Sequence, residues 1–218
     1  AACRARGIPL LLDASAALGR AEIPNDWDVL VGDGASFGGP PLGILVVRPG
    51  TRFTLPYAAE AEHRRALAAP WPPLVAALAA AWTAVLPDSA DDAADGSRLI
   101  DQLRAHAMGW PDIEVLGDPI DRLPHVLTLS ALYVDGERLV EELDRAGFAV
   151  GSGSACASSR LEPSHVLAAM GALTHGNIRI TLPLRAIQAD RAEAMARLAL
   201  ALPRAIERVR SELGAGGL

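Results

Sequence analysis

A lone thiol in a loop of very small residues is the most reactive feature of this sequence. Cys156 lies inside the run 151–159, in which all other residues are Gly, Ser or Ala. Glycine tolerates positive φ and serine favours turns, so we expect a loop here and not a packed element. A cysteine on such an arm is suited to nucleophilic attack or to carrying sulfur between partners. An incidental cysteine in a surface loop is the alternative.

Two further side chains stand where ligands commonly bind. Asp13 ends the apolar run 8–13, and open α/β sheets bind ligands at the carboxyl ends of their strands. The alternative for Asp13 is that it caps the turn that follows. Arg179 interrupts the strand-like run 177–182 and needs an anion, either a bound ligand or a neighbouring Asp or Glu.

The elements that must position these residues predict an α/β chain. Short apolar runs predict strands, and longer Ala-rich or 3.6-periodic runs predict helices. We expect strands at 8–13, 27–32, 44–48, 113–116, 126–130, 148–150 and 177–182. We expect helices at 74–82, where the helix should be packed, at 90–107 and 136–146, from about 164 onward, and at 189–213.

The pattern changes near Trp110, where Gly109 and Pro111 end a helix. Residues 1–110 therefore predict one domain, and residues 111–218 predict a smaller α+β domain that carries the Cys156 loop. The first six residues resemble the end of an amphipathic helix, closed by Gly7. We therefore expect this chain to be a piece of a longer polypeptide or to have lost its front half.

Composition narrows the class of protein. Half of the 218 residues are hydrophobic, which is enough for a sizeable core. The net charge of -6 argues against nucleic acid or an anionic membrane as the main partner, and we expect neither. Two distant cysteines form no disulfide framework or metal cluster, so we expect no metal and a cytoplasmic location. The apolar helix expected near residues 74–85 is too short to span a bilayer.

The cysteine segment resembles a known family. The residues 152–156, followed by Leu161-Glu162-Pro163-Ser164-His165-Val166-Leu167, resemble the active-site segment of NifS/IscS-type cysteine desulfurases. These are class V aminotransferases of the fold-type I pyridoxal phosphate enzymes. The resemblance covers most of this chain and the C-terminal half or so of the family. It implies a remnant of the large cofactor domain followed by a small α+β domain, and it implies that Cys156 is the catalytic nucleophile that takes sulfur as a persulfide.

The resemblance also assigns roles to other residues. It implies that Asp13 pairs with the pyridinium nitrogen of pyridoxal phosphate and that Arg179 holds the substrate carboxylate. By register, the Schiff-base lysine of the family falls on Ser36, which cannot form an imine. A glutamine and a threonine that contact the cofactor in the family are replaced here by Ala16 and Ala68. Ser36 therefore marks a cofactor site that lacks its covalent anchor.

Three functions remain open. The first is a pyridoxal phosphate-dependent cysteine desulfurase that obtains a lysine from elsewhere. The second is a degenerate relative whose Cys156 relays sulfur from cysteine or a persulfide donor to an acceptor protein. The third is a non-catalytic interaction subunit. For each, we expect either a homodimer or pairing with a missing N-terminal half.

Overall fold

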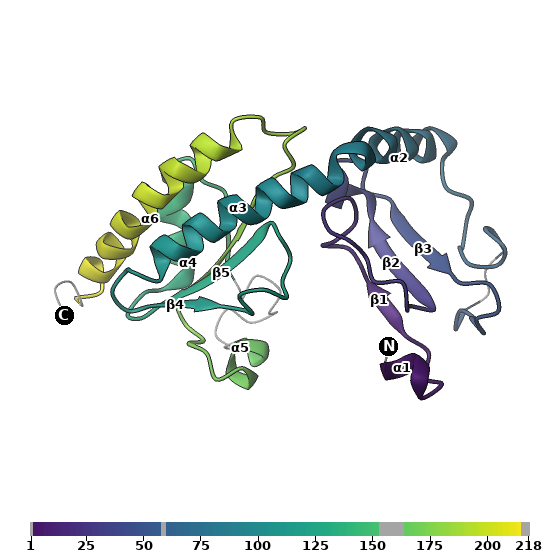
Figure 1. Ribbon diagram of the computed structural model, residues 1–218, viewed down its shortest axis with the longest axis horizontal. Helices are drawn as coiled ribbons and strands as arrows, with labels where there is room; N and C mark the ends of the chain where they lie inside the picture. Colours follow the sequence, from purple (N-terminus) through teal and green to yellow (C-terminus); the bar gives the residue numbers. More distant parts are fainter. Residues whose placement is uncertain (1, 58–59, 153–163, 215–218) are drawn as a thin grey trace. The chain divides into compact units, whose positions relative to one another are not determined.

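The protein is described by a computed structural model that covers residues 2–57, 60–152 and 164–214. The chain divides into two compact units, Ala1–Ala93 and Ala94–Leu218. The first unit contains α1 (Ala2–Ala5), β1 (Leu11–Asp13), β2 (Val29–Asp33), η1 (Gly34–Phe37), β3 (Gly43–Val47), α2 (Pro72–Val85) and η2 (Leu86–Asp88). Helix α3 (Ser89–Ala107) crosses the division (Figure 1). The second unit continues with β4 (Ile113–Leu116), β5 (Val126–Ala131), α4 (Gly136–Arg145), β6 (Gly151–Ser152), α5 (His165–Ala169), β7 (Asn177–Thr181) and α6 (Arg191–Glu212).

The first unit is built on a three-stranded sheet in the order β1-β2-β3. β1 and β2 are parallel, and β3 is antiparallel to β2. β1 therefore pairs on one side only within the described chain. Because β1 and β2 are parallel, Asp13 and Asp33 end their strands at the same edge of the sheet.

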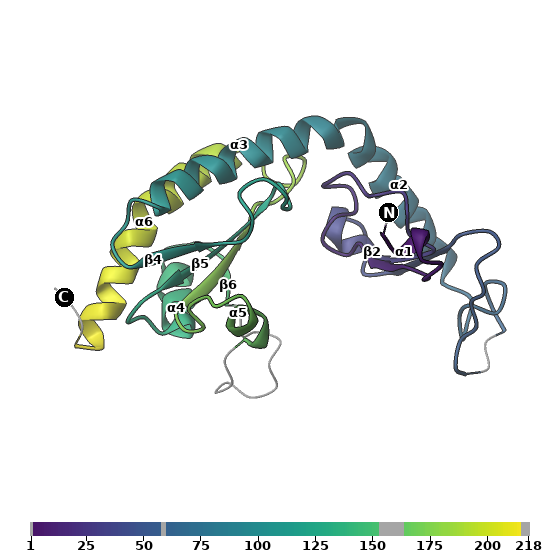
Figure 2. The ribbon, with the colours of Figure 1, turned by 60° about the horizontal axis from the view of Figure 1, so that its bottom comes forward.

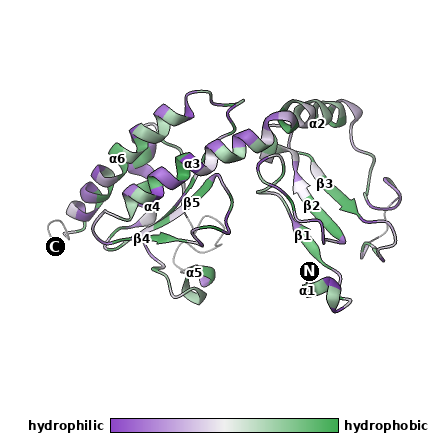
Figure 3. Ribbon diagram, viewed as in Figure 1, coloured by the Kyte–Doolittle hydropathy of each residue, from purple (hydrophilic) through white to green (hydrophobic). Residues whose placement is uncertain are grey.

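Helix α2 contacts the short helix η1 through a few apolar side chains. The ring of Trp82 packs edge-on against Phe37, with 5.1 Å between the ring centroids. Leu78 lies so close to Gly34 that a β-carbon on Gly34 would be 2.4 Å from its Cδ1 atom. No residue of α2 is buried, although most of the helix is hydrophobic (Figure 3). The helix therefore forms as predicted and contacts η1 on one side, but none of its residues is fully buried within the described chain.

The stretch Pro72–Ala107, which joins α2, η2 and α3, is longer than the sequence suggested. Among the described residues it is the one helical stretch long and apolar enough to cross a membrane, judged by length and composition alone. Its most apolar segment is not buried inside the protein. Pro87 does not end the helical path, because it lies in the first turn of η2, where a missing N–H costs no hydrogen bond.

The second unit is built on an antiparallel sheet in the order β4-β5-β7-β6. Strand β7 pairs with β5 along Thr128↔Arg179 and with β6 along Gly151↔Arg179. The strand before the Cys156 loop was predicted at 148–150, but the structure places it at Gly151–Ser152. This small shift matters because it places the residues just before the Cys156 loop beside Arg179.

One face of this sheet carries the main core of the described protein. The buried cluster combines side chains of α3, β5, α4, β7 and α6. Its fully buried members include Ile100, Leu139, Leu143, Leu202 and Val209, whose spacing follows the apolar stripes of their helices. Figure 2 shows α3 and α6 along one side of the sheet and α5 on the other.

A partly buried ion pair ties α3 to the start of α6. Arg191 is 1% exposed, and its Nη2 lies 2.6 Å from Oδ2 of Asp95. Nη1 of Arg191 also donates to the carbonyl of Pro183. The hydrogen bond from Arg191, followed by one from Arg98, holds the pKa of Asp95 below its usual value. Helix α3 therefore packs with the second unit from Ala94 onward.

Candidate functional site

Asp13 lies at the carboxyl end of β1, with its side chain exposed. Its Oδ1 atom accepts hydrogen bonds from the hydroxyl of Ser15 at 2.6 Å and from the backbone N–H of Ser15 at 2.9 Å. The Ser15 hydroxyl and then its N–H lower the pKa of Asp13. Asp13 thus makes the local turn interaction that the capping alternative describes, and it is ionised at neutral pH.

Ser36 lies in η1, directly after β2. Asp33 caps this helix by accepting from the N–H of Ala35 at 2.7 Å, and the hydroxyl of Ser36 donates to the carbonyl of Asp33. Gly34 is required at the start of η1, since a β-carbon there would lie 2.4 Å from the carbonyl oxygen of Pro40. Asp13 and Ser36 are thus brought to the same edge of one sheet by adjacent parallel strands.

The chain contains no residue that could anchor pyridoxal phosphate as an imine. The twenty residues counted as Lys or Arg are all arginine, so none of the 218 residues is a lysine. Arginine cannot replace it, because a guanidinium does not lose its proton near neutral pH. Ser36 is already a hydrogen-bond donor to the backbone, and Ala16 and Ala68 offer no polar side chain. The residues present therefore do not fit a covalently held pyridoxal phosphate.

Arg179 lies at the middle of β7 and is exposed. It shares one face of the sheet with Thr128 on one side and Gly151 on the other. A β-carbon on Gly151 would lie 3.8 Å from Nη2 of Arg179, so the guanidinium reaches along β6. No ion pair or hydrogen bond joins its side chain to another residue in the part of the chain that the structure describes. The structural ion pair considered as an alternative for Arg179 is therefore not found among these residues.

Cys156 lies outside the described residues, as does the stretch 153–163 around it. Its flanks are described. β6 ends at Ser152, and the chain resumes at Ser164, whose Oγ accepts from the N–H of Leu167 at 3.4 Å to cap α5. His165 is the first residue of α5 and is exposed.

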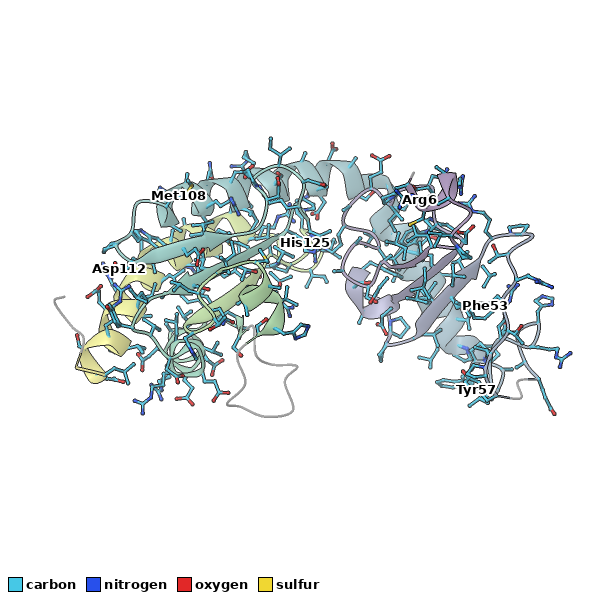
Figure 4. The ribbon with its side chains drawn as sticks, turned by 90° about the horizontal axis from the view of Figure 1, so that it is seen from below. Arg6, Phe53, Tyr57, Met108, Asp112 and His125 are labelled. Atoms are coloured by element: carbon cyan, nitrogen blue, oxygen red, sulfur yellow. The ribbon has the colours of Figure 1, made fainter. Side chains whose placement is uncertain are left out.

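Two polar residues on the same sheet were not singled out from the sequence. Glu114 on β4 and Ser130 on β5 both hydrogen-bond to the backbone of Leu173. The available signal was weak: each is a polar residue inside an otherwise apolar strand. Among the described residues, no group of three His, Cys, Asp or Glu side chains could hold a metal ion. His125 is buried at the start of β5 and lies at one end of that strand (Figure 4).

Curated proteins resemble between one third and nearly all of the chain. A cysteine desulfurase of Trichormus azollae is 32% identical over 215 residues, which is 94% of this chain and 53% of that protein. The cysteine desulfurase NifS of Azotobacter vinelandii is 34% identical over 146 residues, or 65% of this chain and 36% of that protein. A cysteine desulfurase of Cereibacter sphaeroides is 49% identical over 75 residues, or 33% of this chain and 19% of that protein. No family model matches the chain.

Solved structures show the same fold at low identity. A NifS-like protein from Rickettsia africae has a TM-score of 0.75 and 18% identity, covering 96% of this chain and 55% of its own. A second NifS-like protein has a TM-score of 0.71, with coverage of 96% and 53%. The predicted α/β fold is thus confirmed, and the chain spans about half the length of the curated relatives that it matches over most of its own. On these similarities, the chain belongs to the NifS/IscS-type cysteine desulfurase family.

Proposed function

We propose that this chain is a cysteine desulfurase-like sulfur-transfer protein in which Cys156 takes up sulfur as a persulfide and passes it to an acceptor protein. Membership of the desulfurase family supports a sulfur-transfer function. Two facts taken together support the more specific proposal. The chain has no lysine for cofactor chemistry, yet an exposed arginine stands beside the strand that leads into the Cys156 loop.

The position of Arg179 supports recognition of an anionic sulfur donor. Its guanidinium is exposed, and no described acid neutralises it. Cys156 follows Ser152 by four residues, so covalent geometry limits the distance between their Cα atoms to about 14 Å. A guanidinium binds a carboxylate through two parallel hydrogen bonds. A donor such as cysteine persulfide, which carries its own carboxylate, would present its sulfur within reach of Cys156.

The transfer step needs no further reagent. The Cys156 thiolate attacks the outer sulfur of the donor persulfide, and the donor S–S bond breaks as the new S–S bond forms. The donor leaves as a thiolate and takes up a proton. Cys156 is oxidised and the donor is reduced by the same two electrons. A nearby cation favours the thiolate form of a cysteine, so Arg179 would assist this step as well as bind the donor.

An autonomous pyridoxal phosphate-dependent desulfurase is the less favoured function. That chemistry requires an amine that can lose its proton, and this chain supplies none from its side chains. A second copy of the chain could not supply it either. A desulfurase built on this chain would therefore need a different polypeptide that brings a lysine, such as one corresponding to the part of the relatives that this chain does not match.

Exposed apolar residues favour a partner at the first unit. Trp71 is 66% exposed and Leu86 is 50% exposed, at either end of the unburied helix α2. Tyr57, in the segment after β3, is also exposed (Figure 4). This surface supports the interaction-subunit function, through a homodimer or through pairing with a polypeptide that completes the large domain. We place this activity in the cytoplasm.

Mass spectrometry after exposure to cysteine persulfide tests the proposal. We expect one added sulfur atom on Cys156, and none on the protein after Cys156→Ala. Cys3→Ala is the matched control, since Cys3 is the other cysteine of the chain and is half-buried in α1. An unmodified Cys156 under conditions that modify free cysteine would overturn the proposal.

The role of Arg179 is tested by changing the donor. Arg179→Ala should slow sulfur uptake from cysteine persulfide roughly ten- to hundredfold, because a charged hydrogen-bonded pair contributes roughly 1.5 to 3 kcal/mol. Uptake from cysteamine persulfide, which lacks the carboxylate, should change little. Equal losses with both donors would count against carboxylate binding by Arg179.

Absorbance, followed by peptide mapping after borohydride reduction, tests the pyridoxal phosphate-dependent alternative. With added pyridoxal phosphate, we expect no borohydride-reducible adduct on any side chain of this chain. An adduct that maps to an internal peptide, away from the α-amino group of the first residue, would revive an autonomous desulfurase.

A further inference from the structure

The sheet of the second unit opens at its edge, just before β6. The ladder between β6 and β7 ends at Gly151, although residues 148–150 were expected to form a strand. Gly147, with φ at 85°, turns the chain out of α4, and the N–H of Phe148 then donates to the carbonyl of Leu143 at 2.8 Å. Phe148 is thus bonded back to α4, and the chain joins the ladder to β7 only at Gly151.

A cavity of about 390 Å³ lies at this opening. Its walls come from residues 147–150, residues 180–183, Gln188 and the first two turns of α6. Most of the lining side chains are apolar, among them those of Phe148, Val150, Ile180, Met195 and Leu198. The volume is within the range of pockets that hold small molecules, roughly 300 to 1,000 Å³.

The cavity is separate from the side of the sheet that presents Arg179. Successive residues of a strand point to opposite faces, and Ile180 directly follows Arg179 in β7. Ile180 and Leu182 belong to the buried core, and both line the cavity. Arg179 therefore faces the other way, so a ligand of this cavity would not be the sulfur donor proposed for Arg179.

The charges around the cavity favour an anion. Among the described residues that line it, Arg191 and Arg197 are cations and none is an acid. Arg191 is buried, and its ion pair with Asp95 offsets its charge. Arg197 is exposed, and its side chain forms no hydrogen bond or ion pair with another described residue, not even with Glu193 one turn earlier on α6. The guanidinium of Arg197 is therefore available to a ligand.

Gln188 adds a neutral polar group to the same cavity. Its backbone N–H donates to the carbonyl of Leu184 at 2.9 Å, and its side-chain amide bonds to no described residue. The amide can donate one hydrogen bond to an anion, and a guanidinium can donate two in parallel. One available cation and one amide suit a carboxylate, with its single negative charge, better than a phosphate group with a charge of about -2.

We propose that this cavity binds a monocarboxylate with an apolar body of about ten carbon atoms. A water molecule occupies about 30 Å³ of the liquid, so a volume of about 390 Å³ has room for roughly a dozen non-hydrogen atoms. The carboxylate pairs with Arg197 and Gln188, and the apolar body contacts Phe148, Met195 and Leu198. This binding site goes beyond the proposed function and does not depend on it, since it uses no residue assigned to sulfur transfer.

Methionine methyl NMR, with decanoate as the probe, tests the site in the full chain. The chain has three methionines, of which Met195 lines the cavity, whereas Met108 and Met170 are exposed elsewhere. We expect decanoate to shift the Met195 methyl signal saturably and to leave the other two signals unchanged. Met195→Leu identifies the signal. An unmoved Met195 signal would overturn the proposal, and so would equal shifts of all three signals, which indicate non-specific adsorption.

A neutral probe separates recognition of the carboxylate from burial of the chain. Arg197→Ala should weaken decanoate binding about tenfold or more, because it removes a charged hydrogen-bonded pair. Decanol lacks the carboxylate, so it should bind the wild type more weakly than decanoate does, and Arg197→Ala should not change its affinity. Equal losses for the two probes would show that the substitution damaged the cavity, which would overturn recognition of the carboxylate by Arg197.

Arg204→Ala is the matched control for Arg197→Ala. Arg204 is also an exposed arginine of α6 whose side chain bonds to no described residue, but it does not line the cavity. The control should leave the affinity for decanoate at the wild-type value. A loss equal to that of Arg197→Ala would mean that the charge of the helix attracts the anion without a specific site, and would overturn the proposal.

Filling the cavity tests the apolar part of the site. Ala194 lines the cavity from α6, and Ala194→Leu adds volume with a residue that is also a good helix former. The variant should lose the response of Met195 to both decanoate and decanol while its circular dichroism keeps the wild-type helical signal. Wild-type affinity in this variant would overturn the placement of the apolar body. If the variant fails to fold, the comparison of Arg197→Ala with Arg204→Ala still decides.

Discussion

The two units differ sharply in how much apolar surface they bury. Within the described chain, the unit Ala1–Ala93 buries six hydrophobic residues, and the unit Ala94–Leu218 buries twenty-two. Yet the two units expose equal numbers of large hydrophobic residues, eight each. The first unit also contains an apolar cavity of about 790 Å³ between its helices and its sheet. It therefore resembles part of a larger domain, whereas the second unit has a complete core of its own.

The difference in burial between the two units matches the roles that the family resemblance implies for their residues. Asp13 and Ser36, which would face a cofactor, lie in the poorly covered unit, and there the covalent anchor is absent. Arg179 and the flanks of the Cys156 loop lie in the unit with the extensive core. The residues proposed for sulfur transfer are thus placed on the part of the protein that can hold them in position.

Substitutions of apolar residues in the two units test whether the units differ in the stability that burial provides. Leu202→Ala removes a fully buried side chain from the core of the second unit and should lower the free energy of unfolding by about 3 kcal/mol. Val75→Ala in α2, where the side chain is 40% exposed, should cost less than about 0.5 kcal/mol. Denaturant unfolding, with amide exchange in β5 and β2 to separate the units, measures both. A large cost for Val75→Ala would show that α2 is packed in solution.

The Asp95–Arg191 pair should make the second unit sensitive to acid. The folded-state pKa of Asp95 is lowered, so its contribution is present above its unfolded pKa of about 4 and is lost as the pH falls through the folded value. Asp95→Asn should cost about 2 kcal/mol at pH 7, after allowing for the partial exposure of Asp95.

The difference between this variant and the wild type should narrow below pH 4, which unfolding curves at several pH values would reveal. Asp91→Asn, on the exposed side of the same helix, is the control and should show no such trend. A constant difference at every pH would contradict the assignment of the lowered pKa to this pair.

The smallest effect is expected at Asp13 in the first unit. Ser15→Ala removes the hydroxyl that contributes most to lowering the Asp13 pKa, so this pKa should rise toward its ordinary value. NMR titration of the Asp13 carboxyl carbon measures the change. An unchanged pKa would show that the turn after β1 is not formed in solution, which would widen the contrast between the two units.

Local signals in the sequence were sufficient for much of the fold. Strand β4 has the predicted bounds, and the apolar stripes of α3 and α6 identify the faces that pack. The Asp13–Ser15 turn is also local and was among the alternatives considered. The strand predicted at 148–150 is found instead at Gly151–Ser152. A Gly-Ser pair has little strand propensity of its own, so the sequence does not reveal its pairing with β7.

Long-range contacts could not be read from the sequence. The hydrogen bonds that join Leu173 to Glu114 and to Ser130 link residues 59 and 43 positions apart, and no local pattern predicts them. The exposure of α2 was missed for a related reason: its composition shows that the helix is apolar, but not whether this chain buries it. The same limit applies to Arg179. Whether an acidic side chain lies beside it depends on how β5, β6 and β7 pair, and the sequence does not show this pairing.

The unpaired side of β1 has a thermodynamic consequence for any polypeptide that completes the first unit. β1 is only three residues long, so a strand added there could form few main-chain hydrogen bonds. Most of the association free energy would have to come from removing Trp71, Leu86 and their neighbours from water. Calorimetry of such an assembly should therefore record a pronounced negative heat-capacity change, with an association enthalpy that depends steeply on temperature.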